Sequence, residues 1–379
     1  MTARKTEPDG IRPLYCGVKK EPVRFPQGGH AGLWFDKFCN TWQVRNGCWT
    51  MAADRERESP KLDWIDSLCG QIGDHELLSE FAHRRIAMID RLGGWWGVFR
   101  TRTRFVTGLG RSHPVENGFA WHPVLGTAYL PGSSVKGLLL DRVTAGGADK
   151  SVTETLFGKP GGRGALCFLD AVPTEPVRLE ADVMTPHYAG WDSQDPPGDW
   201  RSPVPIPFLV AAEGNRFLFG LVPLDEPTRG RLGQVAAWLE QALREGGAGA
   251  KTAVGYGRME PDRDATPRLR EEHEQRAREL AERHAEQRRL ASLSPLDREL
   301  DDIANQPNYR GKPPYTAWLN ELKAGRWSDD PASEHAVAER VRVAMQRAGK
   351  WKPKSSAKNP DKDTDHQRTL TVLRFLHTT

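Results

Sequence analysis

The sequence lacks the features that would place it in a membrane or hold it together by covalent cross-links. Its 379 residues contain no apolar run long enough to cross a bilayer and no signal-like start, which predicts a cytoplasmic protein without a membrane partner. The five cysteines are odd in number, scattered, and never spaced as CxxC. Neither a disulfide framework nor a zinc site is therefore indicated, and no cofactor is expected.

An excess of one charge is also missing. The net charge is only +4 and the isoelectric point about 8.8, so any surface that binds nucleic acid must come from local clustering of basic side chains. The length allows two domains, or one large domain with extensions. With 38% hydrophobic and 27% charged residues, the composition is that of an ordinary soluble protein.

The glycine-rich stretch GGAGAKTAVGYG, Gly246 to Gly257, is the most informative segment. Apolar residues at helical spacing precede it and predict a helix that ends at Gly246. A short run from Val254 through Tyr256 to Pro261 follows and predicts a strand. The stretch is therefore expected to be a loop that leads from a helix into the edge of a sheet.

The chemistry of this loop suits a phosphate backbone. Glycines such as Gly249 let the main chain approach a ligand, Lys251 adds positive charge, and the Thr252 hydroxyl can bond a phosphate oxygen. A nucleotide-hydrolysing P-loop is disfavoured, because Ala250 stands where that motif needs glycine and the order of helix and strand is reversed. A solvated turn without a ligand stays open as an alternative.

Two further segments carry basic side chains in regular patterns. In GVFRTRTRFV, the side chains of Arg100, Arg102 and Arg104 alternate with apolar and threonine residues, which predicts a strand with an arginine-rich face. In YLPGSSVKGLLLDRV, a helix is expected after Pro131, with Ser133 or Ser134 as its N-cap and Lys136 in its first turn. Such a helix start binds anions. A solvated face and a simple capped helix are the respective alternatives.

The order of elements between Gly97 and Pro261 predicts the fold class. A strand at Ala165–Pro173 precedes a polar excursion that begins at Asp182, and Ile206–Leu224 is predicted to be a β-hairpin that turns at Gly214-Asn215. The resulting order, strand, helix, strand, strand, helix, strand, is that of a ferredoxin-like, RRM-like α+β domain. Such a sheet is also the platform of RNA-recognition domains.

The flanking regions differ in composition and predict three parts. Residues 1–96 form an N-terminal extension with helices between Leu62 and Leu92, divided at Gly73, and residues 97–261 form the core. Residues 262–379 begin with a charged, solvated helix and continue with a small helical region at 295–345. A basic segment around Trp351 is expected to be mobile, and a last apolar helix or strand closes the chain.

Several of these motifs occur in the same order in a known family. TGLGRSHPVENGF, YLPGSSVKGLLLDRV, FLDAVP, DVMTPHYAGW and GAKTAVGYGRM resemble the RAMP superfamily of CRISPR proteins, and within it the sixth RAMP subunit of type III-B Cmr effector complexes. The resemblance covers about Thr107 to Glu260. It implies a non-catalytic subunit that binds CRISPR RNA near its 3′ end, caps the backbone filament of other RAMP subunits, and contributes to binding of the paired target RNA in antiviral defence.

The candidate RNA-binding residues are therefore taken from the converging loops: Arg104, Arg111, His113, Ser133, Ser134, Lys136, Gly249, Lys251, Thr252 and Tyr256. The insertion between Asp182 and Trp200 adds three side chains that could stack on bases or contact a partner protein: His187, Tyr188 and Trp191.

Three alternatives remain beside this hypothesis. A RAMP endoribonuclease that processes guide RNA would need an acid and a base near a ribose 2′-OH, and the candidates are His113, Glu116, His122, His187 and Tyr188. A metal site built from His113, Glu116, His122 or Asp182 has no recognised ligand spacing. Beside the endoribonuclease, the second alternative is the equivalent subunit of a type III-A complex, and the third is a structural protein that never touches RNA.

Overall fold

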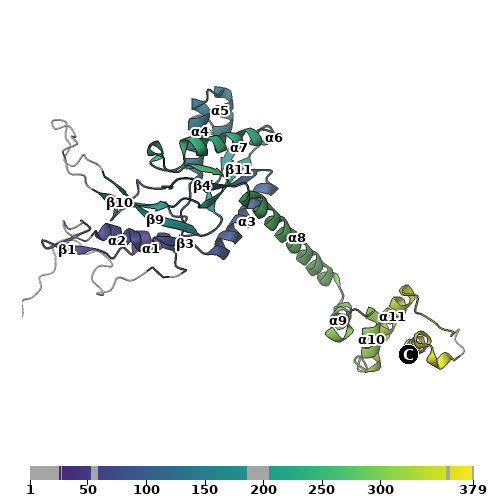
Figure 1. The fold of residues 1–379 in the computed structure, drawn as a ribbon. Coiled ribbons are helices and arrows are strands. Elements are labelled where there is room, and N and C mark those ends of the chain that lie inside the picture. Colours follow the sequence, from purple (N-terminus) through teal and green to yellow (C-terminus); the bar gives the residue numbers. More distant parts are fainter. Residues whose placement is uncertain (1–24, 27, 53–58, 186–204, 356–358, 378–379) are drawn as a thin grey trace, which may run out of the picture. The chain divides into compact units, whose positions relative to one another are not determined.

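The computed structural model describes residues 25–26, 28–52, 59–185, 205–355 and 359–377 (Figure 1). The chain divides into two compact units, Met1–Glu274 and Gln275–Thr379. The boundary falls inside one long helix, α8 (Ala265–Ser292). Among the described residues, no helix is both long and apolar enough to cross a membrane. The division into residues 1–96, 97–261 and 262–379 stays a prediction.

The first unit is built on an antiparallel sheet with the strand order β12-β4-β11-β7. Its strands are β12 (Met259–Pro261), β4 (Trp95–Thr101), β11 (Arg216–Pro223) and β7 (Leu166–Phe168), and the short β8 (Val172–Pro173) also pairs with β11. β11 consists almost entirely of buried apolar residues, because helices cover both of its faces. The predicted α+β class is confirmed.

The side chains of β11 alternate between the two faces of this sheet, and the helices α4 (Gly132–Ala145), α7 (Leu232–Gln241) and α3 (His75–Arg91) lie around it (Figure 1). Phe217 and Phe219 pack in one core with α4 and α7. Leu218 packs in another core with α3. Because α3 covers the second face, this sheet does not offer the open surface that RNA-recognition domains use.

A second sheet has the order β10-β9-β3 and consists of β10 (Ile206–Ala211), β9 (Val177–Met184) and β3 (Gly70–Ile72). The predicted hairpin at Gly214-Asn215 is therefore wrong, since β10 pairs with β9 and β11 pairs with β4. The side chain of Asn215 provides the physical reason. Its amide bonds the backbone N–H and C=O of Arg178 at 2.8 and 3.1 Å, and so takes the place of a strand neighbour.

Other boundaries also move. The expected strand at Ala165–Pro173 is split into β7 and β8 around Asp170, and Asp182 belongs to β9 rather than to an excursion. The predicted helical region Leu62–Leu92 contains β3 between α2 and α3. The remaining elements of the first unit are α1 (Ala31–Lys37), β1 (Gln43–Arg45), β2 (Cys48–Thr50), α2 (Pro60–Asp66), β5 (Ser112–His113), β6 (Glu116–Asn117), α5 (Lys150–Phe157) and α6 (Glu226–Arg229).

The second unit is a helical bundle with its own core. After α8 come α9 (Pro295–Ala304), α10 (Pro314–Lys323), α11 (Pro331–Arg347) and α12 (Thr364–Leu376). Apolar side chains from α9 through α12 form one buried cluster, including Leu300, Leu322, Val341 and Val372. The predicted bundle is thus present, and the last apolar segment is a helix. The expectation of a mobile basic segment is wrong for residues 349–355, which are held against α12.

Candidate nucleic-acid interface

The glycine-rich loop is anchored by main-chain hydrogen bonds. α7 continues as a π-helical turn, η1 (Ala242–Gly246), and ends at Gly247 with φ 80°, one residue later than predicted. The N–H groups of Ala248 and Ala250 donate to the carbonyls of Gly257 and Val106, both at 2.8 Å. These bonds fasten the loop to itself and to the segment after β4.

Two glycines are required at these anchors. A Cβ atom on Gly249 would lie 2.0 Å from the Val106 carbonyl oxygen, and one on Gly257 would lie 1.9 Å from that of Ala248. Both residues also have positive φ, at 86° and 74°. Glycine is therefore needed for backbone to pass close to backbone.

The tip of the loop differs from the predicted strand. Thr252–Val254 form a 3₁₀ turn, and β12 begins only at Met259. Lys251 precedes the turn in the left-handed region, with φ 60°. The Val254 side chain is 70% exposed. The expected strand through Val254 and Tyr256 is wrong, because Gly255 and Gly257 turn the chain before it enters the sheet.

Lys251 carries a charge without a carboxylate partner within the described residues. Its Nζ lies 3.6 Å from Met184 Sδ and 5.6 Å from the centroid of the Phe208 ring. A sulfur atom and an aromatic face stabilise an ammonium group weakly and leave its charge available to an anion. This makes Lys251 the best-placed phosphate ligand of the loop.

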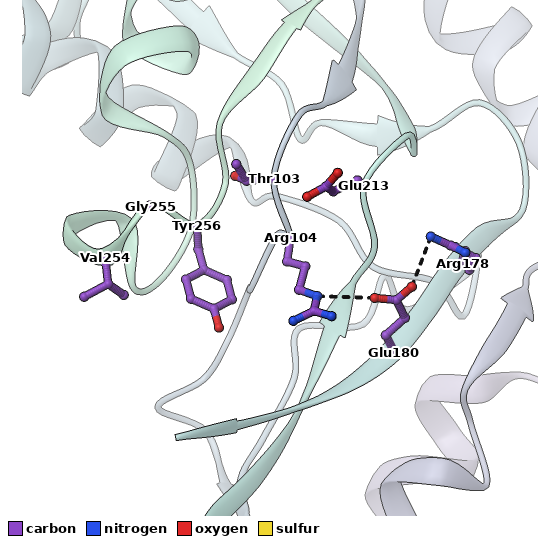
Figure 2. Close-up of a pocket in the computed structure, with 8 residues that line it drawn as sticks. All are labelled: Thr103, Arg104, Arg178, Glu180, Glu213, Val254, Gly255 and Tyr256. Atoms are coloured by element: carbon purple, nitrogen blue, oxygen red, sulfur yellow. Dashed lines mark hydrogen bonds and ion pairs between the residues drawn. The ribbon is translucent and has the colours of Figure 1, made fainter. Parts of the chain in front are cut away.

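A pocket of about 420 Å³ lies beside the loop (Figure 2). Arg104 donates to Glu180 at 3.3 Å and to Asp182 at 3.1 Å, while Arg178 pairs with Glu180 at 3.0 Å. The Tyr256 hydroxyl donates to Asp182 at 2.6 Å. Burial and the Asp182 carboxylate raise the pKa of Tyr256 to about 12. The phenol therefore stays protonated and fixes the loop to β9.

The arginine-rich face is largely neutralised. β4 ends at Thr101, so Arg102 and Arg104 lie beyond the strand. Arg100 and Arg102 both bond the Glu260 carboxylate of β12, at 2.9 and 3.3 Å. The pattern predicted a continuous basic strand surface, and this expectation is wrong because acidic partners come from neighbouring strands.

The start of α4 is also different from the prediction. Its N-cap is Pro131, and neither Ser133 nor Ser134 caps the helix, although both are exposed. The Gly132 N–H donates instead to Asp170 Oδ1 at 2.7 Å. A carboxylate thus already occupies part of this helix start, which weakens its attraction for phosphate. Lys136 lies one turn further along, partly exposed.

α4 and the glycine-rich loop are neighbours in the fold. The helix packs against η1, and Arg142 of α4 pairs with Glu245 of η1 at 3.2 Å. This places the C-terminal half of α4 beside the start of the glycine-rich loop, while Lys251 at the loop tip contacts Met184 of β9 and Phe208 of β10. The structure gives no direct contact between Lys136 and Lys251.

The histidines proposed as RNA ligands or catalysts have structural surroundings. The His113 ring stacks on Phe35 of α1 at 4.0 Å, and its Nε2 is 2.8 Å from the Phe35 carbonyl. His122 is 5% exposed, and its Nδ1 accepts from the N–H groups of Val124 and Leu125. Burial lowers the pKa of both rings. Both histidines are therefore neutral near pH 7 and turned into the protein.

These two histidines predict a pH dependence of stability. Their pKa values are lower in the folded state than in the unfolded state, so the unfolded chain binds protons first as the pH falls. We expect the free energy of unfolding of the first unit to decrease from pH 7 to pH 5, and His122→Asn to reduce this decrease. Hydrogen exchange of the amides around β5 and β6, recorded at both pH values, measures this change in the free energy of unfolding.

The exposed His284 of α8 offers a matched control. His284→Asn should leave the pH profile of the first unit unchanged, because this exposed side chain belongs to the second unit. Equal stability of the wild-type first unit at pH 7 and pH 5 would contradict the assignment.

The remaining candidates have varied positions. Arg111 is exposed beside Gly108, and Glu116 pairs with Lys61. His187, Tyr188 and Trp191 lie outside the described residues. Within the described part of the chain, no group of three His, Cys, Asp or Glu side chains is arranged to hold a metal ion.

Sequence reasoning missed the acidic partners on β9. Arg178, Glu180 and Asp182 share one face of the strand, and alternation in VRLEADVM was the signal. The polar residues that follow Asp182 obscure this alternation at the end of the strand. No local signal pointed to Asp170 at the start of α4.

Comparison with known proteins finds similarity over the segment that contains this site. Residues 98–260 match the model of the RAMP superfamily, so the predicted resemblance is confirmed for the segment that holds the central sheet, α4 and the glycine-rich loop. The protein also resembles one particular subunit. It is 27% identical over 252 residues to the CRISPR system Cmr subunit Cmr6 of Pyrococcus furiosus, an alignment that covers 49% of this chain and 73% of the relative.

Two solved structures are also similar. One is the cryo-EM structure of the Type III-B Cmr-beta bound to cognate target RNA, at 22% identity and a TM-score of 0.46, with 56% of this chain and 78% of the other covered. The second is the crystal structure of Cmr6 from Pyrococcus furiosus, at 25% identity and a TM-score of 0.30, with 44% and 97% covered.

Proposed function

We propose that this chain is a non-catalytic RNA-binding subunit of a type III-B CRISPR effector complex. It binds CRISPR RNA near the 3′ end, caps the filament of other RAMP subunits, contributes to binding of target RNA, and acts in the cytoplasm. The similarity to Cmr6 supports this assignment over a type III-A counterpart. The strand order β12-β4-β11-β7, with α4 and α7 as crossover helices, supports a ferredoxin-like RAMP core.

One observation carries the RNA-binding proposal. Lys251 projects a charge that has no carboxylate partner among the described residues, from a loop that main-chain bonds to Val106 and Gly257 hold in place. A fixed backbone with a free ammonium binds a phosphate without ordering a mobile segment first. Such contacts do not read sequence, which suits a subunit that accepts any guide.

An endoribonuclease is disfavoured by the same geometry. Both ring nitrogens of His113 are used inside the protein, and His122 accepts two backbone N–H groups and is only 5% exposed, so neither ring is open to a ribose. A lysine without a carboxylate partner in the described part of the chain, on a loop fixed by main-chain bonds, favours a phosphate ligand over a purely structural role. The RNA contact therefore accounts for more of the observed arrangement.

Replacement of Lys251 tests the proposal. Lys251→Ala removes about one phosphate contact, so RNA affinity should weaken equally for two RNAs of unrelated sequence, and the slope of log affinity against log salt should fall by about 1. The measurement is a filter-binding titration of the assembled complex at several salt concentrations.

Lys150→Ala is the matched control. Lys150 lies in the same unit, at the start of α5, and its ammonium is 3.8 Å from Glu154. This variant should leave both affinity and slope unchanged. If Lys251→Ala behaves like Lys150→Ala, the loop is a structural turn and the phosphate contact is elsewhere.

A further inference from the structure

The net positive charge of the chain is concentrated outside the RAMP-like segment. Residues 341–379 contain nine Lys and Arg and three Asp, a net charge of +6, while the rest of the chain has a net charge of −2. The first unit thus has little charge in excess, and its strand arginines are paired. The strongest basic surface lies in the second unit, between α11 and α12.

The main chain of this basic segment is fixed against α12. The Lys352 N–H donates to Thr369 Oγ1 at 2.9 Å, and the Lys352 carbonyl lies 2.8 Å from Nδ1 of the buried His366. Trp351 packs on the core of the bundle, and Ser355 donates to Asp363 at 3.0 Å. With Trp351 turned inward, its two lysine neighbours reach the surface on a rigid support.

Basic side chains from the segment and from α12 gather around two carboxylates. Lys350 and Arg368 both lie 3.5 Å from Asp365, and Lys352 lies 3.6 Å from Asp363. Arg347 and Lys354 are exposed at the two ends of the segment. We call these five basic residues with the two aspartates the α12 basic cluster. Its net charge is +3.

We propose that the α12 basic cluster is a second RNA-binding surface, which takes the phosphate backbone of single-stranded RNA without regard to sequence. The inference does not depend on the function proposed for the glycine-rich loop. The ion pairs within the cluster are long, at 3.5 to 3.6 Å, and their basic side chains are 32 to 50% exposed, so a phosphate can approach these cations from the solvent side without displacing the aspartates. Each lysine that contacts a phosphate releases a counterion, which supplies the driving force.

An acidic protein partner fits this surface less well. Stable protein interfaces bury an apolar centre, and in the described segment 347–355 the one large apolar side chain, Trp351, already packs on the bundle core. Binding of phosphates needs only accessible charge and a fixed support, and the cluster has both. The fixed main chain lowers the entropy lost on binding.

Charge removal in the full-length chain tests the inference. The triple variant Lys350→Gln, Lys352→Gln, Lys354→Gln should weaken binding of a fluorescent single-stranded RNA at least tenfold at low salt and reduce the salt slope by about 2, since each contact contributes roughly 0.7. Two RNAs of unrelated sequence should lose affinity equally. Fluorescence anisotropy against salt concentration provides the measurement.

The matched control removes three exposed charges from another part of the same unit: Arg310→Gln, Lys312→Gln, Lys323→Gln. It should change affinity less than twofold. Asp365→Asn provides a test of opposite sign, because it frees Lys350 and Arg368 and should tighten binding. This variant does not depend on whether the triple variant folds, and circular dichroism checks the fold of each.

Three outcomes would overturn the inference. The first is an equal effect of the two triple variants. The second is unchanged or weaker RNA binding by Asp365→Asn. The third is normal RNA affinity of the Lys350–Lys354 variant combined with loss of a protein from the assembled complex, which would assign the cluster to a protein partner. A loss of affinity in Lys251→Ala alone leaves the two sites distinguishable, since that residue belongs to the first unit.

Discussion

Gly249→Val should have the largest effect on RNA binding of any single substitution in the loop. The new Cβ would lie 2.0 Å from the Val106 carbonyl oxygen and 2.8 Å from the Phe105 ring. A β-branched residue is also strained at φ 86°. The loop must leave its anchor, at a cost of more than about 3 kcal/mol. Because Lys251 moves with it, RNA affinity should fall at least about tenfold.

Gly255→Ala separates the two causes. Gly255 has φ 96° in the same loop, but a Cβ there meets no atom within 4 Å. In this variant, backbone strain should lower the free energy of unfolding by only about 1 kcal/mol, and most of the RNA affinity should remain. Hydrogen exchange of the Ala250 amide reports whether the loop stays on its anchor, and filter binding reports the RNA affinity. Equal behaviour of the two glycine variants would mean that the contact with Val106 is not what positions the loop.

Asp262→Ala should be the most destabilising change at the start of α8. The carboxylate is 7% exposed, accepts from Arg216 Nε at 2.7 Å, and accepts from the N–H groups of Asp264 and Ala265. Its loss removes a helix cap, which costs about 1 kcal/mol, and leaves the half-buried Arg216 with Glu175 alone. We expect the free energy of unfolding of the first unit to fall by about 3 kcal/mol in total, near the lower limit for a broken buried ion pair.

The pH dependence of this loss has a defined sign. Burial raises the pKa of Asp262, but the hydrogen bonds from Arg216 and the two N–H groups outweigh it and lower the pKa below its usual value. The stabilisation is therefore complete above the unfolded pKa of about 4 and disappears as the pH falls through the folded value. The difference between wild type and variant should shrink below about pH 4.

Asp264→Ala is the matched control, because this neighbouring carboxylate is exposed. It should change stability by less than about 0.5 kcal/mol. Hydrogen exchange of the β11 amides, measured during unfolding in urea, reports the stability of the first unit separately from that of the helical bundle. A small effect of Asp262→Ala at pH 7 would show that solvent replaces the ion pair.

The sequence predicted the elements that depend on local patterns. Helical spacing placed α4 and α7, and alternation placed β4, although this strand ends at Thr101. These patterns follow directly from the period of the side chains, so they need no knowledge of distant partners. The family resemblance, from motifs between Thr107 and Glu260, is confirmed by the match of residues 98–260 to the RAMP superfamily model.

The failures concern pairing between distant residues. Gly214-Asn215 has the composition of a hairpin turn, but local sequence does not report that the Asn215 side chain bonds β9. The charges of Arg100 and Arg102 were visible, but their shared partner Glu260 lies about 160 residues away. The glycines of the loop were correctly singled out. Their anchor, the Val106 carbonyl, became apparent only in three dimensions.

The separation of β10 and β11 has a consequence for the order of folding. Consecutive strands in the chain belong to different sheets, and β4 pairs with β11 across more than a hundred residues. The central sheet can therefore close only after most of the first unit has been synthesised. In the second unit, α10 contacts α9 and α11, and α11 contacts α12, all close neighbours in sequence. Since local contacts form faster than distant ones, the C-terminal bundle should fold rapidly while the N-terminal unit limits the rate of maturation.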